Sequence, residues 1–174
     1  MLSGKQVQSR ELTPSHEHYL RAIWAVRSER GYARLSDVAR ELEISNATLS
    51  VGLKPLEQRE LLSHDDRRFL VLTPSGERVA REVHHRFQVA RMFLHDVLGV
   101  DEAQADAEAC RLEHDLSGQT VERLLDLIKL LREDRELREF FQRRYTEYHR
   151  QCRPTTECAT CDLACMGTPG PGIA

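Results

Sequence analysis

The first 72 residues combine three helical periods with two short apolar runs, and this order most restricts the fold. Thr13-Pro14-Ser15 has the residues of a helix start, and an apolar face runs from there to about residue 29. Residues 35–42 repeat the helical spacing over a shorter length, and Ile44-Ser45-Asn46 indicates a tight turn. A third helix is therefore expected over residues 47–60.

Two apolar runs follow, Leu61-Leu62 and residues 69–72, on either side of the polar residues 63–68. Such a pattern is typical of a β-hairpin. Three helices, a tight turn before the third and a hairpin together predict a winged helix-turn-helix. The alternative is a small three-helix bundle. Pro55 departs from the pattern, because a proline inside the third helix should kink it or cost about 3 kcal/mol.

The third expected helix is the one that would read DNA. Small polar side chains near its start suit phosphates or base edges, and arginines at the hairpin tip suit phosphates. The candidate DNA contacts are Arg34, Ser45, Asn46, Ala47, Thr48, Ser50, Val51, Lys54, Arg67 and Arg68.

The rest of the chain up to residue 150 is also expected to be helical. Thr73-Pro74 opens a long helix that runs to about Leu98, and further helices are expected to begin at Asp101 and Ser117 and to cover residues 134–150. The predicted organisation is a DNA-binding domain over residues 1–76, a helical domain over 77–150 and a tail over 151–174. The predicted fold class is thus mainly α.

Three side chains that bind metals occur together in the helix expected from Asp101. Cys110, Glu113 and His114 lie at i, i+3 and i+4, which would stack them on one helical face. A thiolate, a carboxylate and an imidazole form most of a coordination shell for a divalent transition metal. The alternative for Cys110 is a small buried hydrophobic side chain, which is a common role for a lone cysteine.

The tail has a different composition, with four cysteines and few large apolar residues. Cys152, Cys158, Cys161 and Cys165 follow the spacing C-x5-C-x2-C-x3-C. Four thiols this close together favour a metal site, either an iron–sulfur cluster or Zn2+. Unligated or redox-active thiols are the remaining alternative.

Charge and hydropathy limit the classes of protein to be considered. The net charge of −3 divides into +3 over residues 1–94 and −6 over residues 95–174, which suits an N-terminal half that meets a polyanion. A signal-peptide core and a membrane-length apolar run are both lacking, so a cytoplasmic protein with no membrane partner is expected. Without a Gly-rich phosphate loop or a nucleophile motif, an enzyme is not expected.

The sequence resembles the diphtheria-toxin-repressor and manganese-transport-regulator family of metal-dependent transcriptional repressors over about residues 13–132. The residues that carry the resemblance are Thr13-Pro14-Ser15, Tyr19-Leu20, residues 31–39 (GYARLSDVA), residues 72–76 (LTPSG), residues 98–102 (LGVDE) and residues 108–114 (EACRLEH). The resemblance implies a winged helix, a helical metal-binding dimerisation domain, and homodimers on palindromic operators in double-stranded DNA. An SH3-like third domain, present in some members, is not expected in a chain of this length.

The resemblance also implies a metal site made of His18, Cys110, Glu113 and His114. This donor set favours Fe2+, with Mn2+, Co2+, Ni2+ or Zn2+ as alternatives. The family's second site is expected to be absent or rebuilt, because two of its ligand positions fall on Phe87 and Arg91. His84 or His85 could substitute there, or both could be ordinary surface histidines.

The sequence leaves two functions open. The first is a metal-responsive, dimeric transcriptional repressor that binds DNA. The second is an accessory protein of iron transport that carries a metal or cluster and uses its winged helix for protein contacts. An apolar stripe between Val121 and Leu131 favours the first, because a monomeric accessory protein would not need this dimerisation surface.

Overall fold

A computed structural model describes residues 12–151, with side chains described up to Tyr148. The chain divides into two units between Ile128 and Lys129, and each is described by itself. The predicted domain boundary at residue 76 falls within the first turn of a helix inside the first unit, so this boundary stays a prediction. The four tail cysteines, Cys152, Cys158, Cys161 and Cys165, lie outside the described residues.

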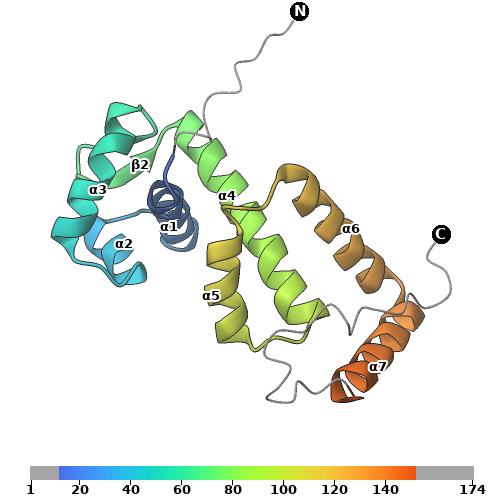
Figure 1. The fold of residues 1–174 in the computed structure, drawn as a ribbon. Coiled ribbons are helices and arrows are strands. Elements are labelled where there is room, and N and C mark those ends of the chain that lie inside the picture. Colours follow the sequence, from blue (N-terminus) through green and yellow to red (C-terminus); the bar gives the residue numbers. More distant parts are fainter. Residues whose placement is uncertain (1–11, 152–174) are drawn as a thin grey trace, which may run out of the picture. The chain divides into compact units, whose positions relative to one another are not determined.

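The N-terminal part of the first unit is a winged helix-turn-helix, as predicted (Figure 1). It contains helices α1 (Pro14–Arg30), α2 (Leu35–Glu41) and α3 (Asn46–Gln58), followed by strands β1 (Leu62–His64) and β2 (Leu70–Leu72). The two strands are antiparallel, and Leu62 pairs with Leu72. All five elements contribute to one buried core. Helix α2 supplies Val38 and Ala39, and the other four elements supply Leu20, Leu49, Leu53, Leu56, Leu62, Leu70 and Leu72.

The helix ends follow from local chemistry. Thr13 accepts a hydrogen bond from the backbone N–H of His16, and Ser45 caps α3 by accepting one from the N–H of Thr48. Gly31 ends α1 with φ at +79°, a left-handed conformation that glycine adopts without strain. Pro55 lies inside α3, which continues for three residues beyond it to Gln58.

The remaining elements of the first unit are helical, as predicted, with one difference. The expected long helix consists of α4 (Pro74–Met92) followed by a π-helical turn, η2 (Phe93–Val97). Helix α5 (Glu102–Leu112) then packs against α4, and α4 also packs against α1 (Figure 1). A small second cluster of Ala90, Leu94, Ala105 and Ala109 fills the space between α4 and α5. Helix α1 therefore contacts both the DNA-binding core and the long helix of the metal-binding part.

Two more helices complete the described chain. Helix α6 (Gly118–Glu133) crosses the division between the units, and α7 (Arg135–Gln151) belongs to the second unit. Val121 and Ile128 on α6 are buried, and the rings of Phe141 and Tyr145 stack on α7 with their centroids 5.7 Å apart. Every helix among the described residues is too short or too polar to cross a membrane.

Gly76 in the first turn of α4 should not tolerate a side chain. A Cβ atom at this position would lie 1.9 Å from the carbonyl oxygen of Leu61, which is a backbone atom with little freedom to move. We expect Gly76→Ala to lower the free energy of unfolding by roughly 1–3 kcal/mol, measured by urea denaturation. The control is Arg78, which is exposed and lies two residues further along α4, and Arg78→Ala should change stability by less than about 0.5 kcal/mol. Equal losses in the two variants would contradict the predicted clash.

Candidate metal centre

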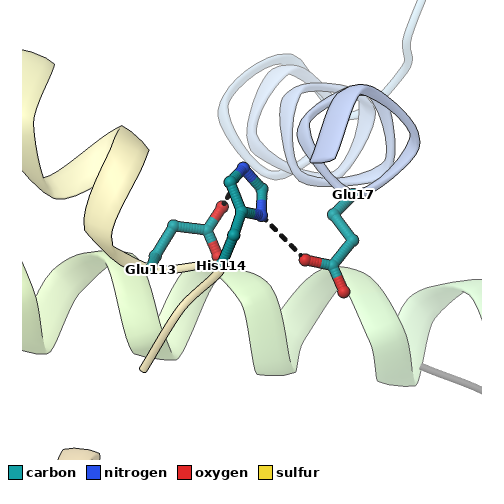
Figure 2. A group of neighbouring side chains, drawn as sticks. All are labelled: Glu17, Glu113 and His114. Atoms are coloured by element: carbon teal, nitrogen blue, oxygen red, sulfur yellow. Dashed lines mark hydrogen bonds and ion pairs between the residues drawn. The ribbon is translucent and has the colours of Figure 1, made fainter. Parts of the chain in front are cut away.

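Two helices of the first unit bring three metal-binding side chains together. Glu17 lies in the first turn of α1, Glu113 caps the C-terminal end of α5, and His114 follows it (Figure 2). One ligand atom from each lies within 4.8 Å of the others. His114 donates a hydrogen bond from Nδ1 to Glu17 Oε2 over 2.9 Å, and its Nε2 lies 3.4 Å from Glu113 Oε1. This group, which we call the Glu17 cluster, joins the DNA-binding part to α5.

The Glu113 carboxylate is the most unusual group of the cluster. Its side chain is 0% exposed, and neither oxygen accepts a hydrogen bond from the described residues. Burial raises the pKa of Glu113 to about 7, and the nearby Glu17 carboxylate adds to this, although His114 and Arg86 oppose the rise. Buried carboxylates nearly always have a hydrogen-bond partner or a metal. The donor set and this orphaned carboxylate therefore fit a divalent cation.

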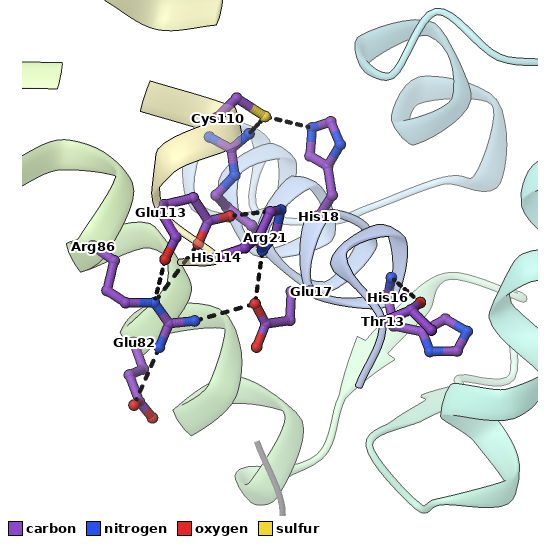
Figure 3. A network of polar contacts seen from close by, with 10 residues as sticks. All are labelled: Thr13, His16, Glu17, His18, Arg21, Glu82, Arg86, Cys110, Glu113 and His114. Carbon is purple, nitrogen blue, oxygen red and sulfur yellow. Dashed lines mark hydrogen bonds and ion pairs between the residues drawn. The ribbon is translucent and has the colours of Figure 1, made fainter. Parts of the chain in front are cut away.

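Cys110 and His18 form a second pair beside the Glu17 cluster. The distance from Cys110 Sγ to His18 Nε2 is 3.9 Å, and Arg21 donates a hydrogen bond to the same sulfur from Nη2 over 3.4 Å (Figure 3). Burial, and to a lesser extent the positive charge of Arg21 and the neighbouring His114, lowers the pKa of His18 to about 4. His18 is thus neutral at pH 7, as a metal ligand must be.

The predicted ligand set is therefore divided in the structure. Glu113 and His114 lie together, whereas Cys110 and His18 lie with Arg21. The expectation that all three α5 residues stack on one helical face is wrong in detail, because α5 ends at Leu112 and His114 lies in the turn after it.

Glu17 is the residue that the sequence analysis missed. It is 6% exposed and lies on the buried face of α1 with Leu20 and Ile23. The spacing 17, 20, 23 places an acidic residue within an apolar helical stripe, and this pattern was the available signal. An acidic residue in the first turn of a helix is also explained by the helix dipole, which hides its second role.

Arg86 of α4 is a positively charged side chain that contacts two residues of the Glu17 cluster directly. It donates to Glu17 Oε2 from Nη2 over 3.2 Å and to the carbonyl oxygen of Glu113 from Nε over 3.0 Å (Figure 3). Its Nη1 donates to Glu82 Oε1 over 3.3 Å. Arg86 thus links the α1 carboxylate to the α5 terminus through the long helix.

The positions of the second site implied by the resemblance hold no metal-binding group in the described structure. The Arg21 guanidinium lies 4.1 Å from the centre of the Phe87 ring, and Arg91 pairs with Asp106 and Glu102. Arg21, Phe87, Arg91 and Asp106 line a cavity of about 430 Å³. His84 also lines it, and its ring centroid lies 4.5 Å from that of Trp24. Burial lowers the pKa of His84, and Arg21 and His85 lower it further. Neither His84 nor His85 belongs to a group of metal-binding atoms among the described residues.

The predicted DNA contacts are all exposed, and they come from the N-cap of α2, from α3 and its cap, and from the hairpin tip. Leu49 and Leu53 are the buried side of α3, so its other side presents the predicted contacts Asn46, Ala47, Thr48, Ser50, Val51 and Lys54. The hydroxyl of Ser45 caps this helix and bonds the Thr48 hydroxyl over 2.8 Å. Arg67 and Arg68 lie at the hairpin tip, and Arg34 stacks on the Phe69 ring at 5.5 Å.

Most of the chain is similar in sequence to known transcriptional regulators. The HTH-type transcriptional regulator MntR of Bacillus subtilis is 31% identical over 141 residues, which are 80% of this chain and 99% of the relative. The MntR regulator of Bacillus pumilus is 32% identical over 124 residues, which are 71% of this chain and 85% of that protein.

Two protein-family domains match successive parts of the chain. Residues 11–70 match "Iron dependent repressor, N-terminal DNA binding domain", and residues 73–141 match "Iron dependent repressor, metal binding and dimerisation domain". The chain belongs to the iron-dependent repressor family. The Glu17 cluster takes one residue from the first part and two from the second. The resemblance to the diphtheria-toxin-repressor and manganese-transport-regulator family is thereby confirmed, and the chain is a metal-dependent transcriptional repressor of this family. The relatives named above are transcriptional regulators and not enzymes.

Solved structures of this iron-dependent repressor family share the fold. The crystal structure of T. acidophilum IdeR has a TM-score of 0.60 at 26% identity, and the match covers 69% of this chain and 55% of that protein. The structure of the manganese regulator SloR has a TM-score of 0.60 at 28% identity and covers 68% and 55%. The chain therefore spans about half the length of these two solved proteins.

Proposed function

We propose that this repressor responds to Fe2+, and that the ion is held between α1 and α5 by the Glu17 cluster. The observation that carries the proposal is the convergence of Glu17, Glu113 and His114 within 4.8 Å from two parts of the chain. Cys110 and His18 lie beside them and would complete the shell with a thiolate and a second imidazole. This combination of oxygen, nitrogen and sulfur donor atoms is suited to a divalent transition metal.

The choice of Fe2+ depends on Cys110. A thiolate favours Fe2+, Co2+, Ni2+ or Zn2+ over the harder Mn2+, whereas the Glu17 carboxylate suits either class. Two similar solved structures are named as a manganese regulator and as a manganese-dependent transcriptional repressor, so Mn2+ is the competing assignment. The absorption spectrum of the Fe2+-loaded protein would distinguish an ion bound by the Cys110 thiolate from an ion bound only by oxygen and nitrogen atoms.

The chain's own residues would couple the ion to DNA. Glu17 moves with α1, which shares a core with α3, and Glu113 and His114 belong to the end of α5. Ligands from both sides fix the placement of α1 relative to α4 and α5. In a dimer, this would set the separation of two α3 helices to match the half-sites of a palindromic operator. Such coupling is typically worth about 1–3 kcal/mol.

The direct test is a mobility-shift titration with DNA from upstream of the protein's own gene. Anaerobic Fe2+ should strengthen binding over chelated protein, and the Arg67→Ala/Arg68→Ala double variant should lose DNA binding while it keeps ion binding. Strong binding with Mn2+ and none with Fe2+ would overturn the iron assignment. Lack of a shift with either ion would overturn ion-dependent binding to this DNA.

We also propose that Cys152, Cys158, Cys161 and Cys165 bind an iron–sulfur cluster, with Zn2+ as the alternative. The short spacing of four thiols supports a metal site. A cluster would give the repressor a second input that reports iron–sulfur or oxygen status. Anaerobically purified protein should then be brown with visible absorbance, and a colourless protein with one stoichiometric zinc would contradict the cluster.

A further inference from the structure

Arg86 lies beside the two carboxylates that would bind the proposed ion. Its side chain is 13% exposed, and its Nη2 lies 3.2 Å from Glu17 Oε2 while its Nε lies 3.7 Å from Glu113 Oε2 (Figure 3). The same Glu17 oxygen accepts the hydrogen bond of His114 Nδ1. Both carboxylates of the Glu17 cluster thus already have a fixed positive charge beside them.

A second carboxylate gives Arg86 another place to bind. Glu82 lies one turn earlier on α4, is 61% exposed and accepts a hydrogen bond from Arg86 Nη1 over 3.3 Å. The guanidinium group therefore spans the space between a buried acceptor, Glu17, and an exposed acceptor, Glu82. Loss of the contact to Glu17 would leave Arg86 with the contacts to Glu82 and to the Glu113 carbonyl.

We propose that Arg86 is an internal competitor of the metal ion. In the ion-free protein it holds the Glu17 carboxylate and lies beside that of Glu113. When a divalent ion binds, it releases Glu17 and keeps its contacts with Glu82 and the Glu113 carbonyl. This inference depends on the proposed function, because it assigns a regulatory residue to the same site. Arg86 then sets the ion concentration at which the repressor responds.

The physical reason is repulsion between like charges in a buried site. A divalent ion bound to Glu17 and Glu113 would lie close to a guanidinium that water screens poorly. Part of the binding free energy must therefore be used to displace or tolerate Arg86, which raises the dissociation constant. A residue that only supports the ligands has the opposite effect, because its removal weakens metal binding.

The test compares Mn2+ affinities of the full chain, measured by electron paramagnetic resonance of the free ion. Mn2+ is the probe because thiolate tails bind it weakly. We expect Arg86→Gln to bind Mn2+ about tenfold more tightly than the wild type, within the range typical of coupled binding events. Glu82→Gln should bind it more weakly, because Arg86 then has no second carboxylate. The matched control is Arg81→Gln, which removes an exposed i,i+4 ion pair with Glu77 on the same helix and should change nothing.

Each outcome decides between the proposals. Equal or weaker Mn2+ binding in Arg86→Gln would overturn the role of Arg86 and leave the proposed function intact. If the wild type binds no Mn2+, the same comparison is made with anaerobic Fe2+. Absence of binding of both ions by the wild type would overturn the Glu17 cluster as a metal site and this inference with it. If Arg86→Gln fails to fold, as judged by circular dichroism, Arg86→Lys takes its place. Lysine keeps the charge but cannot reach several acceptors at once, so binding should tighten by about threefold, and unchanged binding would overturn the proposal.

Discussion

Glu113→Gln is expected to stabilise the ion-free protein at neutral pH and to abolish its response to metal. Burial raises the pKa of Glu113 from 4.5 to about 7, so the folded state prefers the protonated carboxyl. The stability contributed by this group is fully present below about pH 4.5 and is lost as the pH rises through 7. Glutamine has nearly the same shape and cannot ionise, so it avoids this loss.

The measurement is urea denaturation of chelated protein at pH 5 and pH 8. At pH 8 the variant should be more stable than the wild type by about 1–3 kcal/mol, and the gap should narrow at pH 5. Glu122→Gln on the exposed side of α6 is the control and should show no pH-dependent difference. A variant that is less stable than the wild type at pH 8 would contradict the buried, orphaned carboxylate. Glu113→Gln should also show no gain in DNA affinity when Fe2+ is added.

Glu17→Gln is expected to weaken ion binding more than His18→Gln. Glu17 lies in the cluster with Glu113 and His114, whereas His18 lies 3.9 Å from the sulfur of Cys110. Loss of an anionic ligand should lower metal affinity at least as much as loss of an outer partner, which typically costs about 10–100-fold. Loss of the neutral His18 ring should cost less.

The two variants are neighbours in sequence and replace side chains with the same glutamine, so they control for each other. Calorimetric titration with Mn2+ and with anaerobic Fe2+ would give the two affinities. A larger effect of His18→Gln with Fe2+ would place the ion at the Cys110 pair instead. If His18→Gln weakens the binding of both Mn2+ and Fe2+ more than Glu17→Gln does, the assignment of Glu17 as a ligand is contradicted.

The fold could be predicted from the sequence because it depends on local signals. Thr13-Pro14-Ser15 and Thr73-Pro74 mark helix starts that are read within a few residues. The two strands overlap the apolar runs Leu61-Leu62 and 69–72. The π-helical turn after Met92 could not be predicted, because its helical spacing differs little from that of an α-helix.

The candidate site was only half predictable, because it depends on how helices pack. Glu113 and His114 were found from their residue types, but the end of α5 at Leu112 changes which side chains face each other. Glu17 and Arg86 are distant from them in sequence and look like ordinary helix residues. Only the packing of α1 and α5 on α4 brings these two residues next to Glu113.

The central claim is that one ion joins α1 to α5 through Glu17, Glu113 and His114. A crystal structure of the Fe2+-loaded protein, with the ion located by anomalous scattering at the iron edge, tests it most directly. The account predicts an anomalous peak within about 2.0–2.4 Å of an oxygen or nitrogen atom of each of these three side chains. A peak confined to the cavity lined by Arg21 and Arg91, with the Glu17 cluster still closed by Arg86, would contradict it.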